Sequence, residues 1–288
     1  MGKLILGTVQ MGLNYGINNS FGKISIEESY QILLKAYSSG ITTLDTAEAY
    51  GNAHKVIGVF HKNHPDYKFH IVTKVPHTIE ANSIEIKVKE YLEDLEVNCL
   101  DVLMFHSFES FINNPKAIDV LVDLKLKGYI NHIGVSVYTN DQMEYLLNED
   151  EISVIQLPFN LLDNITIRGN LIKQLKAKGK IIHTRSVFLQ GLFFKNSNDQ
   201  NRIVQKLHSE LEILRQITLQ SSCSIEELAL SYCIQQQNID NVIIGVDSMN
   251  HLEANLKASS YTIGEESMKI INTIKVEDLD LLNPSLWK

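Results

Sequence analysis

Residues 101–106 read DVLMFH, a short apolar run that ends in a single histidine. Comparable runs lie at 153–157 (SVIQL) and at 241–244 (NVII). These runs are mainly apolar and do not alternate strictly with polar residues, so they indicate strands that are covered on both faces. The fold that they favour is a parallel β-sheet covered by helices.

Outward from this run, short apolar strands alternate with amphipathic helical patterns. The predicted strands are Leu4–Gly7, Thr42–Asp45, His70–Val75, Asp101–His106, His132–Val137, Ser153–Leu157, Lys180–Thr184 and Asn241–Gly245. A helical pattern follows each strand; in residues 26–37, Ser25 and Glu28 form a capping box and Gly40 supplies the stop.

Eight such units predict an α/β fold, the closed (β/α)8 or TIM barrel. An open doubly wound sheet would need a G-x-G-x-x-G loop after the first strand, and residues 7–16 (GTVQMGLNYG) lack it. No linker divides the chain, so residues 1–288 are predicted to form a single domain. A tail helix is predicted at Glu265–Ile274, followed by LLNPSLW, which is expected to pack onto the barrel.

Two further segments carry local predictions. Ser224 and Glu227 form a second capping box, which predicts a helix that begins before Leu228. Residues 192–202 are rich in polar side chains and predict an exposed loop.

The bulk composition excludes several classes of protein. The net charge of -8 argues against nucleic acid as a partner. No apolar run approaches the roughly 20 residues that cross a membrane, and no targeting segment is recognisable. Cys99, Cys223 and Cys233 form no C-x-x-C pair and have no metal-ligand spacing, which is typical of core thiols in a reducing compartment. A cytoplasmic protein is therefore predicted.

Four polar residues stand at or just past the ends of successive predicted strands: Asp45, Tyr50, Lys74 and His106. In a TIM barrel these ends form the catalytic face. Lys74 is expected to lower the pKa of Tyr50 and make it a proton donor, with Asp45 holding Lys74 charged. His106 would bind a substrate carbonyl or relay a proton to Tyr50. Reduction of that carbonyl needs a hydride, which implies a nicotinamide cofactor.

The segment ITTLDTAEAYG at 41–51 resembles the second-strand signature of the aldo-keto reductases. The resemblance extends from about Leu4 to about Ala258. It implies a (β/α)8 barrel that reduces an aldehyde or ketone with NAD(P)H. It also implies that Tyr50 is the general acid and that the other three strand-end residues assist it.

The same resemblance implies a set of cofactor contacts. Ser136 in HIGVSVY and Gln156 in VIQLPFN would hold the nicotinamide carboxamide, and Arg185 would stack on the nicotinamide ring. Three residues would lie near the pyrophosphate: Ser186, Phe188 and Gly191. The last strand and helix, IIGVDSMNHLEANLKA, would bind the adenosine phosphate through Gly245, Asp247, Ser248, His251 and Asn255.

NADP(H) is the cofactor that the family resemblance implies. NADP-dependent relatives place Arg or Lys near the 2′-phosphate, whereas this chain has Asp247 there. A carboxylate would repel a phosphate but accept hydrogen bonds from a ribose diol, so NAD(H) stays an alternative. Asp247 as a simple helix N-cap is the other interpretation.

The substrate is indicated only by the two ends of the chain. GTVQMGLNYGINN and NPSLW resemble bacterial aldo-keto reductases associated with surface-polysaccharide biosynthesis and carbohydrate metabolism, which implies a sugar or nucleotide-sugar carbonyl. Asn160 would help to shape the pocket. Five aromatic residues are candidates to line it or to belong to the core: Tyr15, Phe21, Tyr138, Phe159 and Phe188.

Two other functions are compatible with the pattern. One is a scaffold or redox-sensing subunit that keeps the cofactor pocket and turns over slowly. The other is a metal-dependent isomerase or hydrolase with His106 and Asp45 as ligands, but the remaining histidines lack ligand spacing and no metal site is predicted. The sequence does not indicate an oligomeric state.

Overall fold

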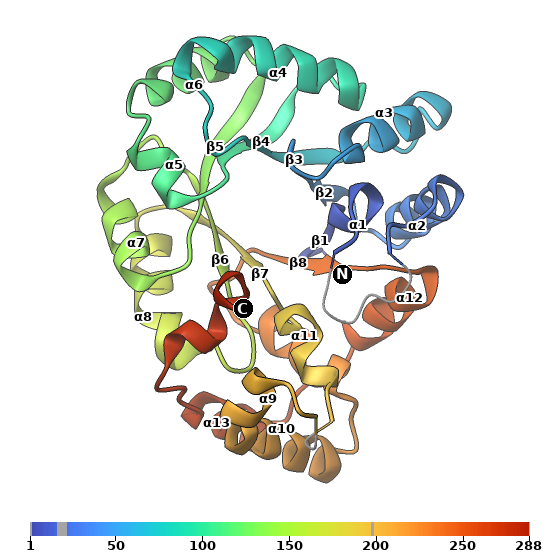
Figure 1. Cartoon of the computed structure of the whole chain (residues 1–288), viewed down its shortest axis with the longest axis vertical. Helices are drawn as coiled ribbons and strands as arrows, with labels where there is room; N and C mark the ends of the chain where they lie inside the picture. The colour runs from blue at the N-terminus through green and yellow to red at the C-terminus, as the bar shows by residue number, and fades with distance from the viewer. Residues whose placement is uncertain (1, 16–21, 197–198, 288) are drawn as a thin grey trace.

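The computed structural model describes residues 2–15, 22–196 and 199–287. Within these residues, eight parallel strands pair in sequence order, and β8 closes onto β1 to form a barrel (Figure 1). The strands are β1 Leu4–Gly7, β2 Thr43–Asp45, β3 His70–Val75, β4 Leu100–Phe105, β5 Ile130–Ser136, β6 Val154–Pro158, β7 Ile181–Arg185 and β8 Asn241–Gly245. The predicted (β/α)8 barrel is therefore confirmed.

Helices surround the barrel and connect successive strands (Figure 1). The first half of the chain contributes α1 Val9–Gly12, α2 Ile26–Ser38, α3 Ala53–Asn63, α4 Ala81–Leu95, α5 Phe108–Ile112, α6 Lys116–Leu126 and α7 Asn140–Tyr145. The second half contributes α8 Ile165–Ala177, α9 Arg202–Lys206, α10 His208–Ser221, α11 Ile225–Ile234, α12 Met249–Ala258 and α13 Glu265–Thr273. Short 3-10 turns are η1 Leu146–Asn148, η2 Leu189–Phe194, η3 Leu279–Leu282 and η4 Pro284–Leu286.

The strand ends differ slightly from the sequence prediction. β1, β3 and β8 have the predicted bounds, and the other strands shift by one or two residues. β4 ends at Phe105, so His106 is the first residue after the strand. β7 continues to Arg185, which places this residue at the rim of the barrel. Strand ends depend on backbone pairing with neighbours, which an apolar run does not encode.

Two layers of apolar side chains stabilise the barrel. Inside it, Val72, Val102, Met104 and Val154 form a small cluster with Ile181 packed against them. Outside it, a larger core joins the strands to the helices. Both faces of the sheet are thus buried, which is why the strands read as continuous apolar runs.

The two predicted capping boxes have different outcomes. Around Ser224 and Glu227 the box is complete, and each side chain accepts from the other's backbone N–H. Ser25 also accepts from the N–H of Glu28. The Glu28 carboxylate, however, accepts from the N–H of Met249 at 3.3 Å and so lies at the start of α12. A contact across 221 residues replaces the local one.

The tail packs back as predicted. Asn164 Nδ2 donates to the carbonyls of Ile271 and Ile274 at 3.1 and 3.0 Å, which ties the end of α13 to the start of α8 (Figure 1). Leu281 and Leu282 are buried, and Trp287 packs against the core.

The predicted exposed loop at 192–202 is only partly correct. Leu192 and Phe193 belong to η2 and are buried, because their apolar side chains reach the core. Residues 197 and 198 lie outside the described part of the chain.

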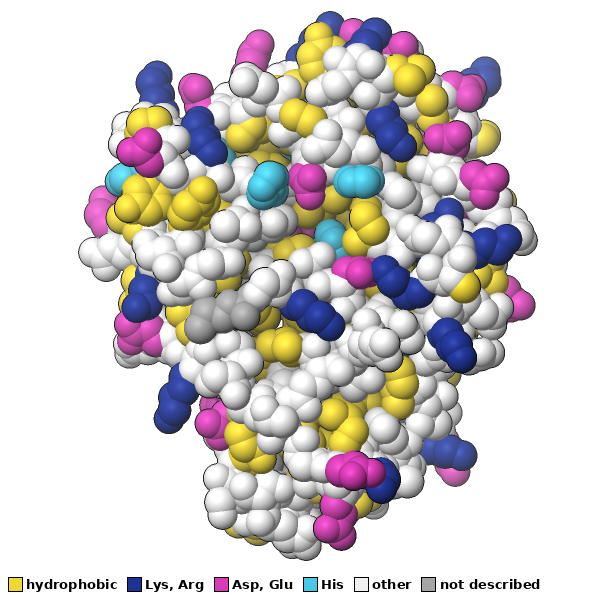
Figure 2. All heavy atoms as spheres, turned by 180° about the vertical axis from the view of Figure 1, so that it is seen from behind, with side chains coloured by type: hydrophobic (Ala, Val, Ile, Leu, Met, Phe, Trp, Pro, Cys, Tyr) yellow, Lys and Arg dark blue, Asp and Glu magenta, His cyan; other side chains and the backbone are white. Residues whose placement is uncertain are grey.

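The surface shows no concentration of one sign of charge on the face in Figure 2, where acidic and basic side chains are interspersed. No helix in the described ranges combines the length and the apolar character needed to cross a bilayer.

One close approach between backbones fixes the loop after β2. A Cβ atom added to Gly12 would lie 1.6 Å from the carbonyl oxygen of Tyr50. Gly51, with φ of 59°, is also closely packed, since a Cβ there would lie 2.6 Å from the carbonyl oxygen of Gly12. Two glycines therefore allow α1 to lie directly on the loop that carries Tyr50.

We expect Gly12→Ala to lower the free energy of unfolding by about 1–3 kcal/mol, because the methyl group must displace backbone atoms. Urea unfolding followed by circular dichroism measures this change. Gly264→Ala is the matched control, since no atom lies within 4 Å of a Cβ there. Equal stability of the two variants would contradict the close approach.

Candidate active site

The strand period brings the candidate side chains to one end of the barrel. Val72 on β3 and Met104 on β4 face the interior. Side chains two residues apart in a strand point the same way, so Lys74 and His106 continue these rows to the carboxyl rim. The same phase places three residues of the next strands on this rim: Ser136, Gln156 and Arg185.

A buried ion pair lies at the centre of the site. Lys74 Nζ donates to both oxygens of Asp45, at 2.7 and 2.8 Å, and to the carbonyl of Thr46 at 3.1 Å. Lys74 is only 2% exposed. Burial alone would lower the pKa of Lys74, but the Asp45 carboxylate and the Tyr50 phenol together outweigh it and the pKa is raised. Lys74 is therefore held as a fixed cation.

Tyr50 lies against this cation and against His106. Lys74 Nζ is 5.3 Å from the centroid of the Tyr50 ring. The rings of Tyr50 and His106 are nearly perpendicular, with centroids 6.1 Å apart. The structure thus brings together all four residues that the sequence singles out for catalysis.

The predicted direction of the Tyr50 pKa is wrong. Burial of the phenol raises the pKa of Tyr50, and the positive charges of Lys74 and Arg185 offset this only in part. The nearby cation can be recognised in the sequence, but the cost of moving a phenolate out of water depends on burial in the fold. At neutral pH the phenol keeps its proton, which is the form that a proton donor requires.

His106 is neutral in the folded protein. Burial, with smaller effects from Lys74 and His77, lowers the pKa of His106 to about 3. Its Nδ1 atom is buried and has no hydrogen-bond partner among the described residues. His77 stacks on the ring with centroids 4.5 Å apart. A neutral imidazole carries one N–H donor, so it can bind a carbonyl oxygen without adding charge.

A second polar layer behind Lys74 was not predicted. Thr73 points to the outside of the barrel, where its hydroxyl meets His54 Nε2 at 2.8 Å. The Tyr91 hydroxyl bonds to the Glu48 carboxylate, which also accepts from Lys87 at 3.1 Å. The only sequence signal for this layer is the strand period, which turns Thr73 away from Lys74 and toward α3.

Gln156 and Ser136 lie where a carboxamide could be bound. Gln156 Nε2 donates to Asp45 at 2.8 Å, which leaves its amide oxygen as an acceptor. Ser136 is buried and pairs in register with Gln156 on the neighbouring strand. Together they offer a donor and an acceptor, the pair that a primary amide needs.

Arg185 stacks on a side chain of its own chain. The guanidinium carbon lies 4.1 Å from the centroid of the Tyr138 ring, and Nη2 donates to the Val137 carbonyl at 3.2 Å. The predicted partner was a nicotinamide ring. The contact between Tyr138 and Arg185 was not predicted, because the sequence does not show that the loop after β5 folds over the end of β7.

The loop after β7 is held in a strained conformation. Four of its residues have left-handed φ values: Ser186 (63°), Leu189 (46°), Gln190 (53°) and Gly191 (92°). Each non-glycine residue in this region costs about 1–2 kcal/mol. Asn160 Nδ2 donates to the Ser186 carbonyl at 3.2 Å and helps to hold the loop. Asn160 is itself fully buried, so it supports the loop and does not line a pocket. Strain of this kind is common where a loop receives a ligand.

Carboxylate side chains lie close to the start of α12. Ser248 is the N-cap and accepts from the N–H of His251, so Asp247 does not cap the helix through its side chain. Asp247 Oδ1 lies 2.5 Å from His251 Nδ1. With Glu28 on the N–H of Met249, two carboxylates lie at this helix terminus. The first turn of the helix contains no Lys or Arg.

Gln10 was not predicted but lies beside this region. A Cβ on Gly245 would meet Gln10 Nε2 at 3.1 Å, so the amide lies against the end of β8. Gln10 Oε1 is buried and has no partner among the described residues. This orphan acceptor and the strained loop together fit a bound dinucleotide. Asn255, the predicted adenine contact, is buried on α12.

The aromatic candidates for the substrate pocket separate into two groups. Phe159 is wholly buried and stacks on Tyr232 with centroids 5.6 Å apart, so it belongs to the core. Tyr15, Tyr138 and Phe188 are at least partly accessible, and Gln190 Nε2 donates to the Tyr15 hydroxyl at 3.0 Å. Phe21 lies outside the described residues.

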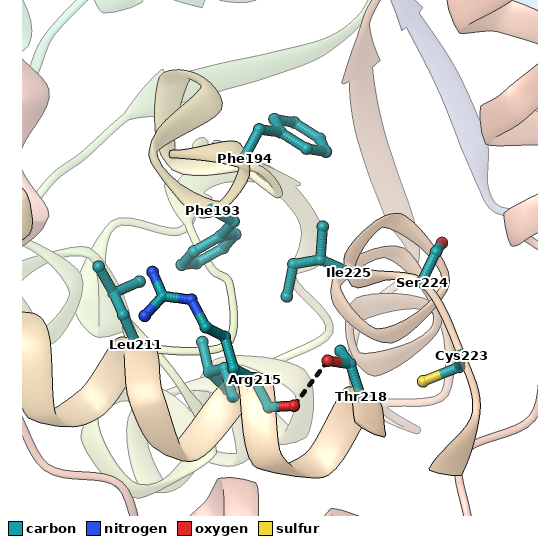
Figure 3. A pocket seen from close by; sticks show the side chains of 9 residues that line it. Phe193, Phe194, Leu211, Arg215, Thr218, Cys223, Ser224 and Ile225 are labelled. Atoms are coloured by element: carbon teal, nitrogen blue, oxygen red, sulfur yellow. Dashed lines mark hydrogen bonds between the residues drawn. The ribbon is translucent and has the colours of Figure 1, made fainter. Parts of the chain in front are cut away.

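A separate cavity of about 370 Å³ lies between η2, α10 and α11 (Figure 3). Phe193 and Phe194 form one wall, and Leu211, Arg215 and Ile225 form the others. It contains none of the four catalytic candidates. Among the described residues no group of three or more His, Cys, Asp or Glu side chains is arranged to hold a metal ion.

Comparison with known proteins decides the family. The model of the aldo/keto reductase family matches residues 3–276. The chain belongs to this family. Membership makes it an NAD(P)-dependent oxidoreductase that acts on carbonyl compounds.

Curated relatives are distant but cover almost the whole chain. The NADH-specific methylglyoxal reductase of Escherichia coli (strain K12) is 22% identical over 303 residues, covering 92% of each chain. L-galactose dehydrogenase of Arabidopsis thaliana is 23% identical over 289 residues, covering 93% of this chain and 91% of the relative.

Solved structures of the family share the fold. The holo form of aldo-keto reductase AKR11C1 from Bacillus halodurans superposes with a TM-score of 0.78 at 20% identity, over 95% of this chain and 92% of the other. Glycerol dehydrogenase AKR11B4 from Gluconobacter oxydans gives 0.75 at 19% identity, over 94% and 90%. This aldo/keto reductase is thus a family member by sequence and by fold.

The buried histidines make stability depend on pH. Burial lowers the pKa of His54 and of His183 to about 4, against an ordinary value of 6.5. The unfolded chain therefore binds more protons than the folded one between these values, so stability falls as the pH drops from 6.5 towards 4. The free energy of unfolding should therefore fall between pH 7 and pH 5. We expect His54→Gln to make this fall smaller by about 1–2 kcal/mol.

Urea unfolding at pH 7, 6 and 5 tests this dependence. His70→Gln, which changes an exposed histidine at the start of β3, is the control and should keep the wild-type slope. An unchanged slope in the His54 variant would show that this imidazole is not buried as described.

Proposed function

We propose that this enzyme reduces an aldehyde or ketone derived from a sugar or nucleotide sugar to the alcohol, in the cytoplasm. The observation that carries the proposal is the Tyr50 phenol, protonated, beside a buried Lys74 cation and a neutral His106. This is the arrangement that a proton donor to a carbonyl oxygen needs. The three free cysteines are compatible with a reducing compartment.

The chain's own residues act on the carbonyl oxygen. A nicotinamide, when bound, supplies the hydride for the carbonyl carbon. His106 donates a hydrogen bond to the oxygen and holds it near Tyr50. As negative charge develops there, Tyr50 transfers its phenolic proton, and Lys74 stabilises the phenolate left behind. Asp45 keeps Lys74 charged and oriented throughout.

The residues at the rim would hold the cofactor. Ser136 and Gln156 would bind the carboxamide, and the strained loop after β7 would lie along the pyrophosphate. The end of β8 and the start of α12 would bind the adenosine half through a set that includes Gly245, Asp247, Ser248, His251 and Asn255. Gln10 joins this set because of its orphan oxygen beside Gly245.

We further propose that the enzyme prefers NAD(H) to NADP(H), the alternative left open by the sequence. A 2′-phosphate at the start of α12 would meet the carboxylates of Asp247 and Glu28 without a Lys or Arg from that turn. The repulsion disfavours the phosphate, whereas a ribose diol can donate to either carboxylate. The E. coli relative named as NADH-specific is in line with this preference.

A sugar-derived substrate is supported by the ends of the chain and by the names of two relatives. The two ends of the chain resemble bacterial members associated with sugar and surface-polysaccharide metabolism. Two relatives bear the names L-galactose dehydrogenase and L-glyceraldehyde 3-phosphate reductase, and both names refer to small sugars.

Tyr50→Phe tests the mechanism. Loss of the phenolic proton should lower kcat by roughly 10²–10⁴-fold and leave cofactor affinity unchanged, since the ring remains. Stopped-flow hydride transfer with an aldehyde panel and fluorescence titration of NADH measure the two quantities.

Tyr145→Phe, an exposed tyrosine at the end of α7, is the control and should behave as wild type. Near-normal turnover by the Tyr50 variant would refute its role as donor. Tight cofactor binding without hydride transfer in the wild type would favour the scaffold or sensor alternative.

Asp247→Arg tests the cofactor preference. An arginine at this position removes one repulsive carboxylate and offers bidentate contacts to a phosphate, so the NADP(H)/NAD(H) affinity ratio should rise at least about tenfold. Fluorescence titrations of both cofactors provide the ratio. Asp141→Arg on α7 makes the same charge change at an exposed site and should leave the ratio unaltered. If Asp247→Arg left the NADP(H)/NAD(H) affinity ratio unchanged, Asp247 would have no role in cofactor recognition.

A further inference from the structure

Arg185 is a cation at the mouth of the barrel that no carboxylate neutralises in the described part of the chain. It is the last residue of β7, on the same rim as Lys74 and His106. Asp163, the acidic group on which its charge acts, already forms a bidentate pair with Arg168 at 2.6 and 2.9 Å. Among residues 2–15, 22–196 and 199–287, Arg185 itself contacts the Val137 carbonyl and the Tyr138 ring.

The charges of the four catalytic candidates cancel, so Arg185 gives the barrel mouth its net positive charge. Asp45 and Lys74 neutralise one another at 2.7 Å. His106 is neutral because its pKa is about 3. The charge of Arg185 acts on Tyr50, His106 and Tyr15, so it lies within electrostatic reach of the reacting oxygen.

The guanidinium is also held in place with donors to spare. One face is stacked on Tyr138, and one N–H donates to Val137. A guanidinium has five N–H donors, so most of them have no acceptor among the described residues. The backbone is fixed as well, because the Arg185 carbonyl accepts from the N–H of Phe159 at 3.0 Å. A preorganised guanidinium with free donors is suited to a planar carboxylate or to a phosphate.

We propose that Arg185 is the anion-binding residue of the substrate site, and that the substrate carries a carboxylate or phosphate in addition to its carbonyl group. This inference rests on the proposed reductase function and narrows its substrate class. Tyr138 is the positioning residue, since its ring fixes the guanidinium plane. The assignment replaces the stacking of Arg185 on the nicotinamide that the family resemblance implies.

Two matched pairs of substrates test the proposal at low salt. Glyceraldehyde 3-phosphate and glyceraldehyde differ by a phosphate, and succinic semialdehyde and butanal differ by a carboxylate. The wild type should prefer the anionic member of at least one pair, and the favoured pair identifies the anion. Arg185→Met should lower the anionic/neutral ratio of kcat/KM by about 10–10²-fold, the value of one charged hydrogen-bonded contact. Arg185→Lys should retain part of the preference.

Salt and cofactor binding supply independent measurements. Raising the ionic strength should raise KM for the anionic substrate in the wild type but not in Arg185→Met. Equal kcat/KM values for both members of both pairs in the wild type would overturn the proposal. The proposal would also be overturned if Arg185→Met left the anionic/neutral ratio of kcat/KM unchanged and weakened NADH binding. That result would assign Arg185 to the nicotinamide ring. If the wild type reduces none of the four compounds, the reductase function itself fails and the anion site fails with it.

Discussion

The pair of Asp45 and Lys74 is the constraint on which the rest of the site depends. Two opposite charges are buried in an apolar barrel, where each would be strongly unfavourable alone. Their contact at 2.7 Å keeps Lys74 protonated. Gln156 adds a hydrogen bond to the same carboxylate, so strands β2, β3 and β6 are joined across the barrel mouth. The polar centre is thus rigid before any ligand binds.

This rigid ion pair lies beside two uncharged side chains, and the contrast in charge accounts for their different proposed roles. Tyr50 and His106 lie above the pair, and burial keeps both uncharged. A neutral acid and a neutral hydrogen-bond donor surround the place where a carbonyl oxygen would gain negative charge. The fixed Lys74 cation then has its largest effect on the charged state that forms during the reaction.

Much of this could be predicted from the sequence, and the rest depends on contacts that sequence does not encode. The apolar runs gave the eight strands, and the period of two put Lys74 and His106 on one rim. The pKa of Tyr50 depends on burial by the whole fold, so its direction was predicted wrongly. The Glu28 carboxylate accepts a hydrogen bond from Met249, which is 221 positions away. The Arg185 guanidinium lies over the Tyr138 ring in another loop, and no local sequence pattern indicates either contact.

The close approach of Gly12 and Tyr50 has a consequence for how the enzyme matures. Tyr50 follows β2, but its backbone rests on α1, which directly follows β1. β1 pairs with β2 on one side and with β8, near the far end of the chain, on the other. The proposed proton donor therefore reaches its final place only when β1, which leads into α1, has joined β2. A chain that holds Asp45, Tyr50, Lys74 and His106 but lacks β1 and α1 would have no surface on which the Tyr50 loop could rest, so the first strand contributes to the site without adding a side chain to it.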